Sequence, residues 1–392
     1  MKALFPRVLL PSFLLLIIAS SIPAGQSKGA KKSGSIWIVR HILTSRSAID
    51  KAVRDLEDTG MEHAFVQVSG RLHSYFPSSI LPIAEELERS CDLEDPFGYF
   101  VSEARKRKIK IHAWMNVFFA WSSEGRPKSP EHPFNKNPGW FVYYKDGIST
   151  RKMPISVLQT RDIPGYFISP VHPSFVNLMK RYVEEIVTKY EIDGIHLDYM
   201  RYPSRDTGFG EMERTLFERQ YYVDPILLFK DEETLSERFG RAGIKDLKGK
   251  WTLFRAALVQ DAVKSIRDVL ERSGQEVTLS AAVLPDPDSA RVFYGQDWES
   301  WLGENIVDFV VLMSYSSNMG QFVAFLDNNT VKSNADRIIA GISTYNQPLE
   351  TALEEARFAL DAGFAGVCFF SYNDLSSKRR SLQPIKQLLI DR

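Results

Sequence analysis

The segment DGIHLDYMRYP, residues 193–203 of the 392-residue chain, has the alternation of a buried strand. Gly194, His196 and Asp198 alternate with apolar residues, and successive side chains of a strand face opposite sides. Residues 173–190, just before it, repeat apolar side chains at the spacing of an amphipathic helix. Parallel α/β proteins carry their chemistry at the carboxyl ends of strands that follow helices. Asp198 is therefore the first candidate for a catalytic group.

Short apolar segments like this one recur along the chain, with helical patterns between them. Their lengths and β-branched or aromatic content are typical of parallel strands buried on both faces. Eight such strands predict an α/β fold of the (β/α)8 TIM barrel type. A doubly wound open sheet is the alternative, but no Gly-x-Gly-x-x-Gly motif follows the first strand. The predicted strands are residues 35–40, 61–68, 109–117, 194–199, 277–283, 307–313, 337–342 and 366–370.

Two connections of this predicted barrel are long, residues 118–170 after strand 3 and residues 203–250 after strand 4. Both follow the carboxyl ends of strands, so we expect them to wall the pocket around Asp198 rather than to form a separate domain. The first contains aromatic residues that either stack on sugar rings or pack the loop onto the barrel. These residues are Trp121, Trp140, Phe141, Tyr143 and Tyr144.

The amino terminus has the pattern of an export signal. Lys2 and Arg7 precede an apolar run, and small residues follow it up to Ala24. We predict a signal peptide over residues 1–24, a polar linker over 25–34 and one catalytic-type barrel over 35–392. An uncleaved anchor is the alternative. The mature chain is then exported, periplasmic or extracellular, with no membrane span.

The overall charge excludes one class of partner. The chain has 49 Lys plus Arg and 49 Asp plus Glu, so no net field favours nucleic acid. The two cysteines do not make a disulfide scaffold. His196 and Asp198 face the same way, but no companion His or Glu motif completes a metal site, so we expect no metal and no cofactor. The oligomeric state stays open.

Polar and aromatic residues at the predicted strand ends form the candidate binding site. We expect His196 to lie one layer deeper than Asp198 and to orient it through a hydrogen bond, or else to be a satisfied core histidine. The predicted substrate-binding residues are Arg71, Trp114, Asn116, His196, Arg201, Tyr202, Tyr315, Tyr345 and Tyr372.

Glycoside hydrolysis is the chemistry that fits these residues best. No Gly-x-Ser-x-Gly elbow and no Gly-rich lysine loop occurs, whereas glycosidases normally use two carboxyls. Asp198 is predicted as the nucleophile or general base. Asp286, in a proline-rich turn after strand 5, is the preferred acid, and a helix-start or turn role is its alternative. A noncatalytic glycan-binding barrel is the competing function.

The segment 193–203 also resembles the signature of the glycosyl hydrolase-like 10 family, bacterial exported (β/α)8 proteins. Further similar segments are HAWMNV at 112–117, YGQDW at 294–298, VDFVV at 307–311 and FSY at 370–372. The resemblance implies a carbohydrate-active enzyme of the cell envelope, acting on peptidoglycan strands or another bacterial polysaccharide, with Asp198 in the matching acidic position. Family 18 chitinases carry a catalytic Glu where this chain has Met200, so their chemistry is not expected here.

Overall fold

The computed structural model describes residues 33–377 and 382–390. The predicted signal peptide and residues 25–32 of the predicted linker lie outside the described residues. The first strand, β1 (Ser33–Ile38), begins two residues earlier than predicted. Ser33 and Gly34 pair in parallel with Gly366 and Val367 of the last strand. These two residues therefore belong to the barrel and not to the linker.

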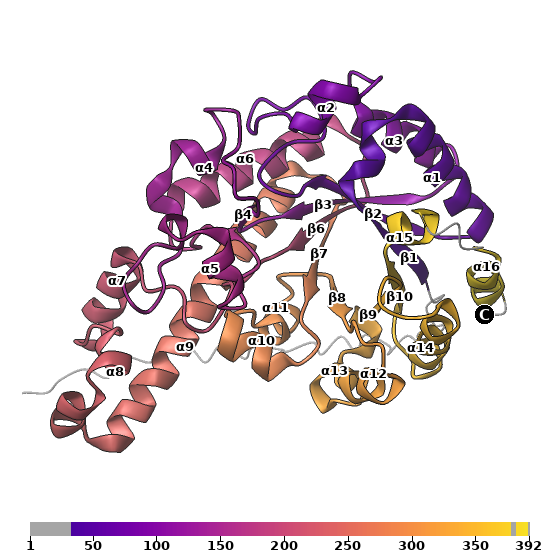
Figure 1. Cartoon of the computed structure of the whole chain (residues 1–392). Coiled ribbons are helices and arrows are strands. Elements are labelled where there is room, and N and C mark those ends of the chain that lie inside the picture. Colours follow the sequence, from indigo (N-terminus) through magenta and orange to yellow (C-terminus); the bar gives the residue numbers. More distant parts are fainter. Residues whose placement is uncertain (1–32, 378–381, 391–392) are drawn as a thin grey trace, which may run out of the picture. The chain divides into compact units, whose positions relative to one another are not determined.

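Eight parallel strands close into a barrel, with helices around them (Figure 1). The predicted (β/α)8 fold is confirmed, and every predicted strand lies within two residues of an observed one. Around the barrel each strand pairs with the next, and β1 pairs with both β2 and β10. The barrel strands are β1, β2 (His63–Ser69), β3 (Lys110–Asn116), β6 (Gly194–Asp198), β7 (Thr278–Val283), β8 (Phe309–Met313), β9 (Ile338–Ser343) and β10 (Gly366–Phe370).

The helices begin and end where the sequence supplies caps. Ser45 accepts a hydrogen bond from the amide of Ala48 at the start of α1, and Gly60 ends this helix with a left-handed φ of 71°. Pro173 stands in the first turn of α6, where its missing N–H costs nothing. The longer helices are α1 (Arg46–Thr59), α3 (Pro96–Arg105), α6 (Pro173–Lys189), α7 (Glu211–Tyr221), α9 (Glu232–Ser273) and α14 (Leu349–Asp361). The shorter helices are α2 (Glu85–Ser90), α4 (Pro133–Lys136), α5 (Ile155–Gln159), α8 (Leu227–Lys230), α10 (Pro287–Tyr294), α11 (Trp298–Gly303), α12 (Met319–Leu326), α13 (Asn329–Ser333), α15 (Tyr372–Ser377) and α16 (Gln383–Ile390).

Alternation along the strands separates two apolar layers. In β6, Ile195 and Leu197 belong to the large core between strands and helices. A smaller aromatic cluster, which includes Trp37, Phe65 and Trp114, fills the inside of the barrel. Side chains that point inward at the carboxyl ends of the strands therefore lie above this cluster, and they are the ones available for a site.

The two long connections differ in what they do. The first contains an antiparallel pair, β4 (Phe119–Trp121) and β5 (Tyr166–Phe167). The second folds into α7, α8 and the start of α9, which is kinked at Gly240 and begins well before the predicted residue 251. Its apolar side chains pack on one another in a separate cluster that includes Phe217 and Trp251.

No helix of the described residues combines the length and apolar character that crossing a membrane needs.

Candidate active site

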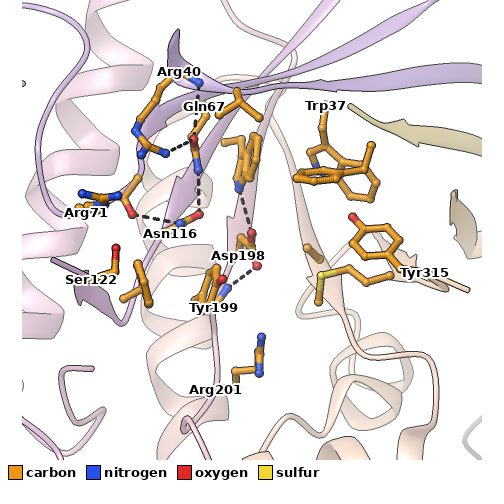
Figure 2. Close-up of a pocket in the computed structure, with 17 residues that line it drawn as sticks. Trp37, Arg40, Gln67, Arg71, Asn116, Ser122, Asp198, Tyr199, Arg201 and Tyr315 are labelled. Atoms are coloured by element: carbon orange, nitrogen blue, oxygen red, sulfur yellow. Dashed lines mark hydrogen bonds between the residues drawn. The ribbon is translucent and has the colours of Figure 1, made fainter. Parts of the chain in front are cut away.

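A pocket of about 380 Å³ opens at the carboxyl ends of the barrel strands (Figure 2). Of the predicted site residues, it brings together Arg71, Trp114, Asn116, Asp198, Arg201 and Tyr315. Phe119 and Ser122 come from the first long connection, as expected. The second connection, all of which the structure describes, contributes no lining residue, so that part of the prediction is wrong. The remaining lining residues are Trp37, Val39, Arg40, Gln67, Gly70, Tyr199, Ala282, Met313 and Phe370.

Asp198 ends β6 and is the only carboxylate among the described residues that line the pocket. Its side chain is held on both oxygens. The indole N–H of Trp114 donates to Oδ2 at 3.2 Å, and the backbone N–H of Tyr199 donates to Oδ1 at 2.6 Å. Tyr199 has a φ of 54°, a left-handed conformation that is strained for an aromatic residue and turns the chain away from the strand. This geometry fixes the carboxylate at the mouth of the barrel.

The environment of Asp198 changes its acidity. Asp198 is only 6% exposed to solvent. Burial raises the pKa of Asp198 from 3.8 to about 6, while the charge of Arg201 and the two N–H donors act in the opposite direction. A carboxyl with this pKa exists in both protonation states near neutral pH, which is what an acid or base in catalysis requires.

His196 lies one layer deeper than Asp198, as predicted, but it does not orient it. The indole N–H of Trp37 donates to its Nε2 at 3.1 Å, so Nδ1 carries the proton and faces the Ser280 hydroxyl at 2.9 Å. Burial lowers the pKa of His196 to about 3 and keeps the ring neutral. The alternative of a satisfied core histidine is the one observed, and Trp114 takes the orienting role instead.

A chain of hydrogen bonds orients the amides on one side of the pocket. Arg40 Nη1 donates to Oε1 of Gln67 at 3.0 Å, and Nε2 of Gln67 donates to Oδ1 of Asn116 at 3.2 Å. Nδ2 of Asn116 then donates to the carbonyl of Gly70 at 3.0 Å. Each side-chain amide has one donor end and one acceptor end. The guanidinium of Arg40 can only donate, so it fixes the orientation of both amides in this series of hydrogen bonds.

The loop after β2 needs a glycine at position 70. A Cβ on Gly70 would lie 2.8 Å from Arg40 Nη1, so a side chain there would displace the guanidinium. The register of β2 against β3 also shifts between Gln67 and Ser69, which makes the end of the strand irregular. Arg71 follows directly and reaches the pocket.

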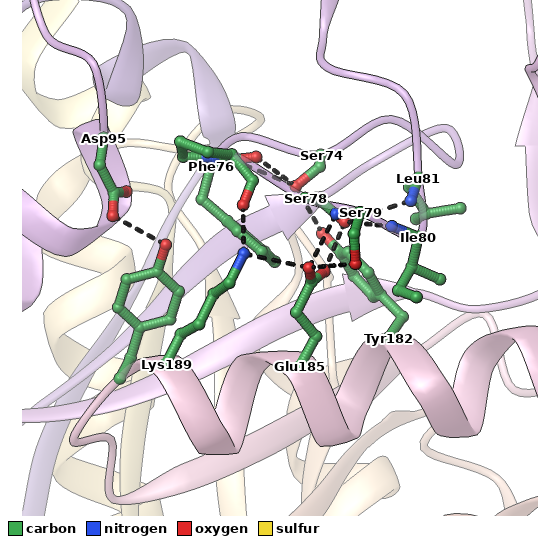
Figure 3. A network of polar contacts seen from close by, with 12 residues as sticks. Ser74, Phe76, Ser78, Ser79, Ile80, Leu81, Asp95, Tyr182, Glu185 and Lys189 are labelled. Carbon is green, nitrogen blue, oxygen red and sulfur yellow. Dashed lines mark hydrogen bonds and ion pairs between the residues drawn. The ribbon is translucent and has the colours of Figure 1, made fainter.

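The rest of this loop is held on α6 by Glu185 (Figure 3). Its carboxylate accepts hydrogen bonds from the Ser78 hydroxyl and from the backbone and hydroxyl of Ser79. Lys189 pairs with it at 3.0 Å and also donates to the carbonyl of Pro77. Burial acts to raise the pKa of Glu185, but these donors outweigh it and lower that pKa. The network anchors the segment that begins at Arg71.

Two arginines of the pocket lie against aromatic rings. Arg71 Nη1 donates to the Ser123 hydroxyl at 3.1 Å, and its guanidinium lies over the buried ring of Trp121 at 5.5 Å. Arg201 lies 5.0 Å from the ring centre of Tyr199 and 5.3 Å from that of Tyr294. Its buried Nε has no hydrogen-bond partner among the described residues. Cations held mainly by aromatic faces keep their N–H donors for a ligand.

Aromatic rings form the opposite side of the pocket. Tyr315 stacks on Phe370 with ring centres 5.4 Å apart, and Trp37 meets Tyr315 edge-on at 6.1 Å. Tyr345 is half exposed beside Tyr315, at 6.3 Å between ring centres, but it does not line the pocket. The pocket thus has a polar, cationic side and an aromatic side, the combination that suits a sugar ring.

Besides His196 and Tyr345, three predicted site residues lie outside the pocket. Asp286 caps α10, with Oδ1 accepting from the Ser289 amide at 2.7 Å, so its turn role is the one observed. Tyr372 is buried and donates to Asp55 of α1 at 2.7 Å. Tyr202 is buried beneath the guanidinium of Arg255, 4.5 Å from its ring centre. None of the three lines the pocket. Their positions at strand ends predicted the correct edge of the barrel but not the direction of the side chain.

Sequence reasoning also missed some lining residues. Trp37 and Phe370 have the pattern of ordinary strand residues, and the alternation of residues 194–199 predicts that Tyr199 faces away from Asp198. Their inward alternation in β1 and β10 was a usable signal for the first two. The left-handed turn at Tyr199 had no such signal.

Among the described residues there is no group of three or more His, Cys, Asp or Glu side chains that could hold a metal ion.

Comparison with known sequences gives a family. A family model described as Glycosyl hydrolase-like 10 matches residues 34–357, which confirms the resemblance that the motifs indicated. Glycosyl hydrolase YngK of Bacillus subtilis (strain 168) is 25% identical over 179 residues, 44% of this chain and 31% of that protein. Glycosyl hydrolase DigH of Escherichia coli (strain K12) is 26% identical over 165 residues, 40% of this chain and 34% of that protein. The matched stretch is about a third of each relative.

Comparison with solved structures shows the same fold at low sequence identity. The PgaB (BpsB) glycoside hydrolase domain from Bordetella bronchiseptica has a TM-score of 0.67 and 14% identity, covering 91% of this chain and 99% of that one. The catalytic domain of a beta-amylase from Paenibacillus polymyxa has a TM-score of 0.58 and 13% identity, covering 93% and 99%. At this sequence identity, the similarity to both structures shows that the barrel fold is shared.

Proposed function

This chain is a member of the glycosyl hydrolase-like 10 family, and from that premise we propose that it hydrolyses glycosidic bonds of a bacterial polysaccharide. Cell-wall glycan is the first candidate substrate. The observation that carries the proposal is Asp198, a buried carboxyl at the end of β6 with both oxygens held and a pKa raised to about 6. We further propose that the protein is exported and works in the periplasm or outside the cell.

The raised pKa supports a role for Asp198 as general acid, where the sequence had suggested a nucleophile or base. In its protonated form the carboxyl gives its proton to the leaving glycosidic oxygen as the bond from this oxygen to the anomeric carbon breaks. Water then adds to the anomeric carbon and gives one proton to the Asp198 carboxylate, which restores the acid. The aromatic side of the pocket carries the sugar ring, and Asn116 and Arg201 orient its hydroxyls. Removal of a general acid typically costs about 10²- to 10⁴-fold in rate.

A noncatalytic glycan-binding barrel is the second candidate, and one observation favours it. Glycosidases normally use two carboxyls, whereas among the described residues Asp198 alone lines the pocket. The two functions differ in product release. The purified protein is incubated with peptidoglycan and a panel of bacterial polysaccharides, and products are identified by mass spectrometry. Hydrolysis by the parent that Asp198→Asn abolishes supports the enzyme; binding without any product supports the second function.

A further inference from the structure

The charges that line the pocket are unequal. Three lining residues carry a guanidinium, and among the described lining residues one carries a carboxylate. Arg40 and Arg71 lie near each other on one side of Asp198, and Arg201 lies apart from them (Figure 2). A neutral sugar would need hydroxyl partners but not three cations.

We propose that the pocket selects a sugar unit that bears a carboxylate, and that Arg71 and Arg40 bind this group. The proposal rests on the proposed function in one respect, that the pocket holds a glycan. It goes further in naming the chemical class of that glycan.

The mutual position of Arg40 and Arg71 is the first support. Burial lowers the pKa of Arg71, and the nearby charge of Arg40 lowers it further, so the two guanidiniums repel each other. Each guanidinium donates a hydrogen bond to a neutral acceptor, Arg40 to the amide oxygen of Gln67 and Arg71 to the hydroxyl of Ser123. Two cations held together in a partly buried pocket favour an anion between or in front of them.

Glu86 is a nearby carboxylate that partly offsets these charges. A second cavity, of about 260 Å³, shares Arg40 and Arg71 with the pocket and is also lined by Glu86. Burial lowers the pKa of both arginines and the charge of Glu86 acts to raise it, and Glu86 also accepts the hydroxyl of Tyr75. Glu86 therefore offsets part of the positive charge in this second cavity. It does not line the pocket, where the arginines face Asp198 and the aromatic rings.

The use of arginine rather than lysine favours a carboxylate as the group that binds in the pocket. A guanidinium presents its donors as a planar fork that matches the two oxygens of a carboxylate, which a lysine does not. Two sources of such a carboxylate in polysaccharides are the ring of a uronic acid and the lactyl ether of a muramic acid unit. Both present the same group to Arg71, so the experiment must separate them.

The test compares each glycan with its own carboxyl-reduced form. Peptide-free strands of N-acetylglucosamine and N-acetylmuramic acid represent the lactyl source, and polyglucuronate and polygalacturonate represent the uronate source. We expect kcat/KM to fall about tenfold to a hundredfold on reduction of the carboxyl in one of these sources, mainly through KM. Equal values for both members of every pair would overturn the proposal.

Variants then assign the effect to a residue. Arg71→Gln is expected to bring the ratio between the carboxylated and reduced forms close to one, and Arg71→Lys to recover part of it. Arg105→Gln is the matched control, because Arg105 pairs with Glu191 on the exposed surface, and its ratio should equal the parent's. A ratio that Arg71→Gln leaves unchanged in a folded variant would contradict the assignment. The parent's own ratio tests the inference even if this variant does not fold.

Binding measured by calorimetry separates this inference from the proposed function. If the parent binds a carboxylated glycan more tightly than its reduced form but releases no product from either, hydrolysis fails and the inference stands. If it hydrolyses both forms equally well, hydrolysis stands and the inference fails.

Discussion

Replacing Asp198 by Asn tests the reasoning about the pocket more directly than any other change. The raised pKa means that the folded protein bears a cost for the ionised carboxyl that the unfolded chain does not. The folded state holds its proton up to about pH 6, while the unfolded chain loses it near 3.8. This group therefore makes the folded state less stable as pH rises from about 4 to above 6.

The size of the effect follows from the two pKa values. A shift from 3.8 to about 6 corresponds to about 3 kcal/mol, of which about 2 to 3 kcal/mol develops between pH 4 and 7.5. Asn cannot ionise, so the stability of the Asn variant relative to the parent should improve by this amount across the same range. Any hydrogen bond to Trp114 or Tyr199 that Asn makes poorly costs the same at both pH values and cancels in the comparison.

The assay is urea unfolding of both proteins at pH 4 and 7.5, combined with product release from the best substrate. Asp286→Asn is the matched control, because Asn also caps helices and this residue lies outside the pocket. Its activity should equal the parent's. An Asp198→Asn variant that loses stability relative to the parent as pH rises would refute the conclusion that ionised Asp198 destabilises the folded state. It would instead support a stabilising ion pair between Asp198 and Arg201. Full activity in that variant would refute its role in catalysis.

Three other outcomes are expected. Trp114→Phe removes the N–H donor that stabilises ionised Asp198, so the pKa of this carboxyl rises; the fall of kcat at high pH should move to higher pH in a pH profile, and an unchanged profile would contradict a general acid role. Glu185→Gln should lower the free energy of unfolding by about 1–3 kcal/mol at neutral pH, because donors in its network lose an acceptor. The difference should shrink as acidification protonates Glu185, whose lowered pKa makes this happen at a lower pH than for an ordinary glutamate, and an equal difference at all pH values would argue against an ionised Glu185. Amino-terminal sequencing of the secreted protein should begin near Gly25, whereas Met1 retained on a cytoplasmic protein would contradict export.

The sequence alone determined the barrel and six of the residues that line its pocket. Eight short apolar segments with helical patterns between them are sufficient to predict the barrel. The reason is that parallel strands buried on both faces need apolar, β-branched or aromatic side chains along their whole length. Alternation in residues 193–203 placed Asp198 at the carboxyl end of a strand, and β6 ends at this residue. The same alternation on β3 set Trp114 and Asn116 on one face, and both line the pocket.

The tertiary structure decided which partners those side chains meet. His196 bonds to Trp37, 159 residues away in the chain, and not to Asp198 two residues on. Tyr372 turns to Asp55, 317 residues away, although its place at a strand end suggested the pocket. The physical reason is that strand periodicity sets the face of a residue, while hydrogen-bond partners and burial come from neighbouring strands. The pKa of Asp198 has the same origin, because desolvation depends on everything packed around the carboxyl and not on the residues beside it in sequence.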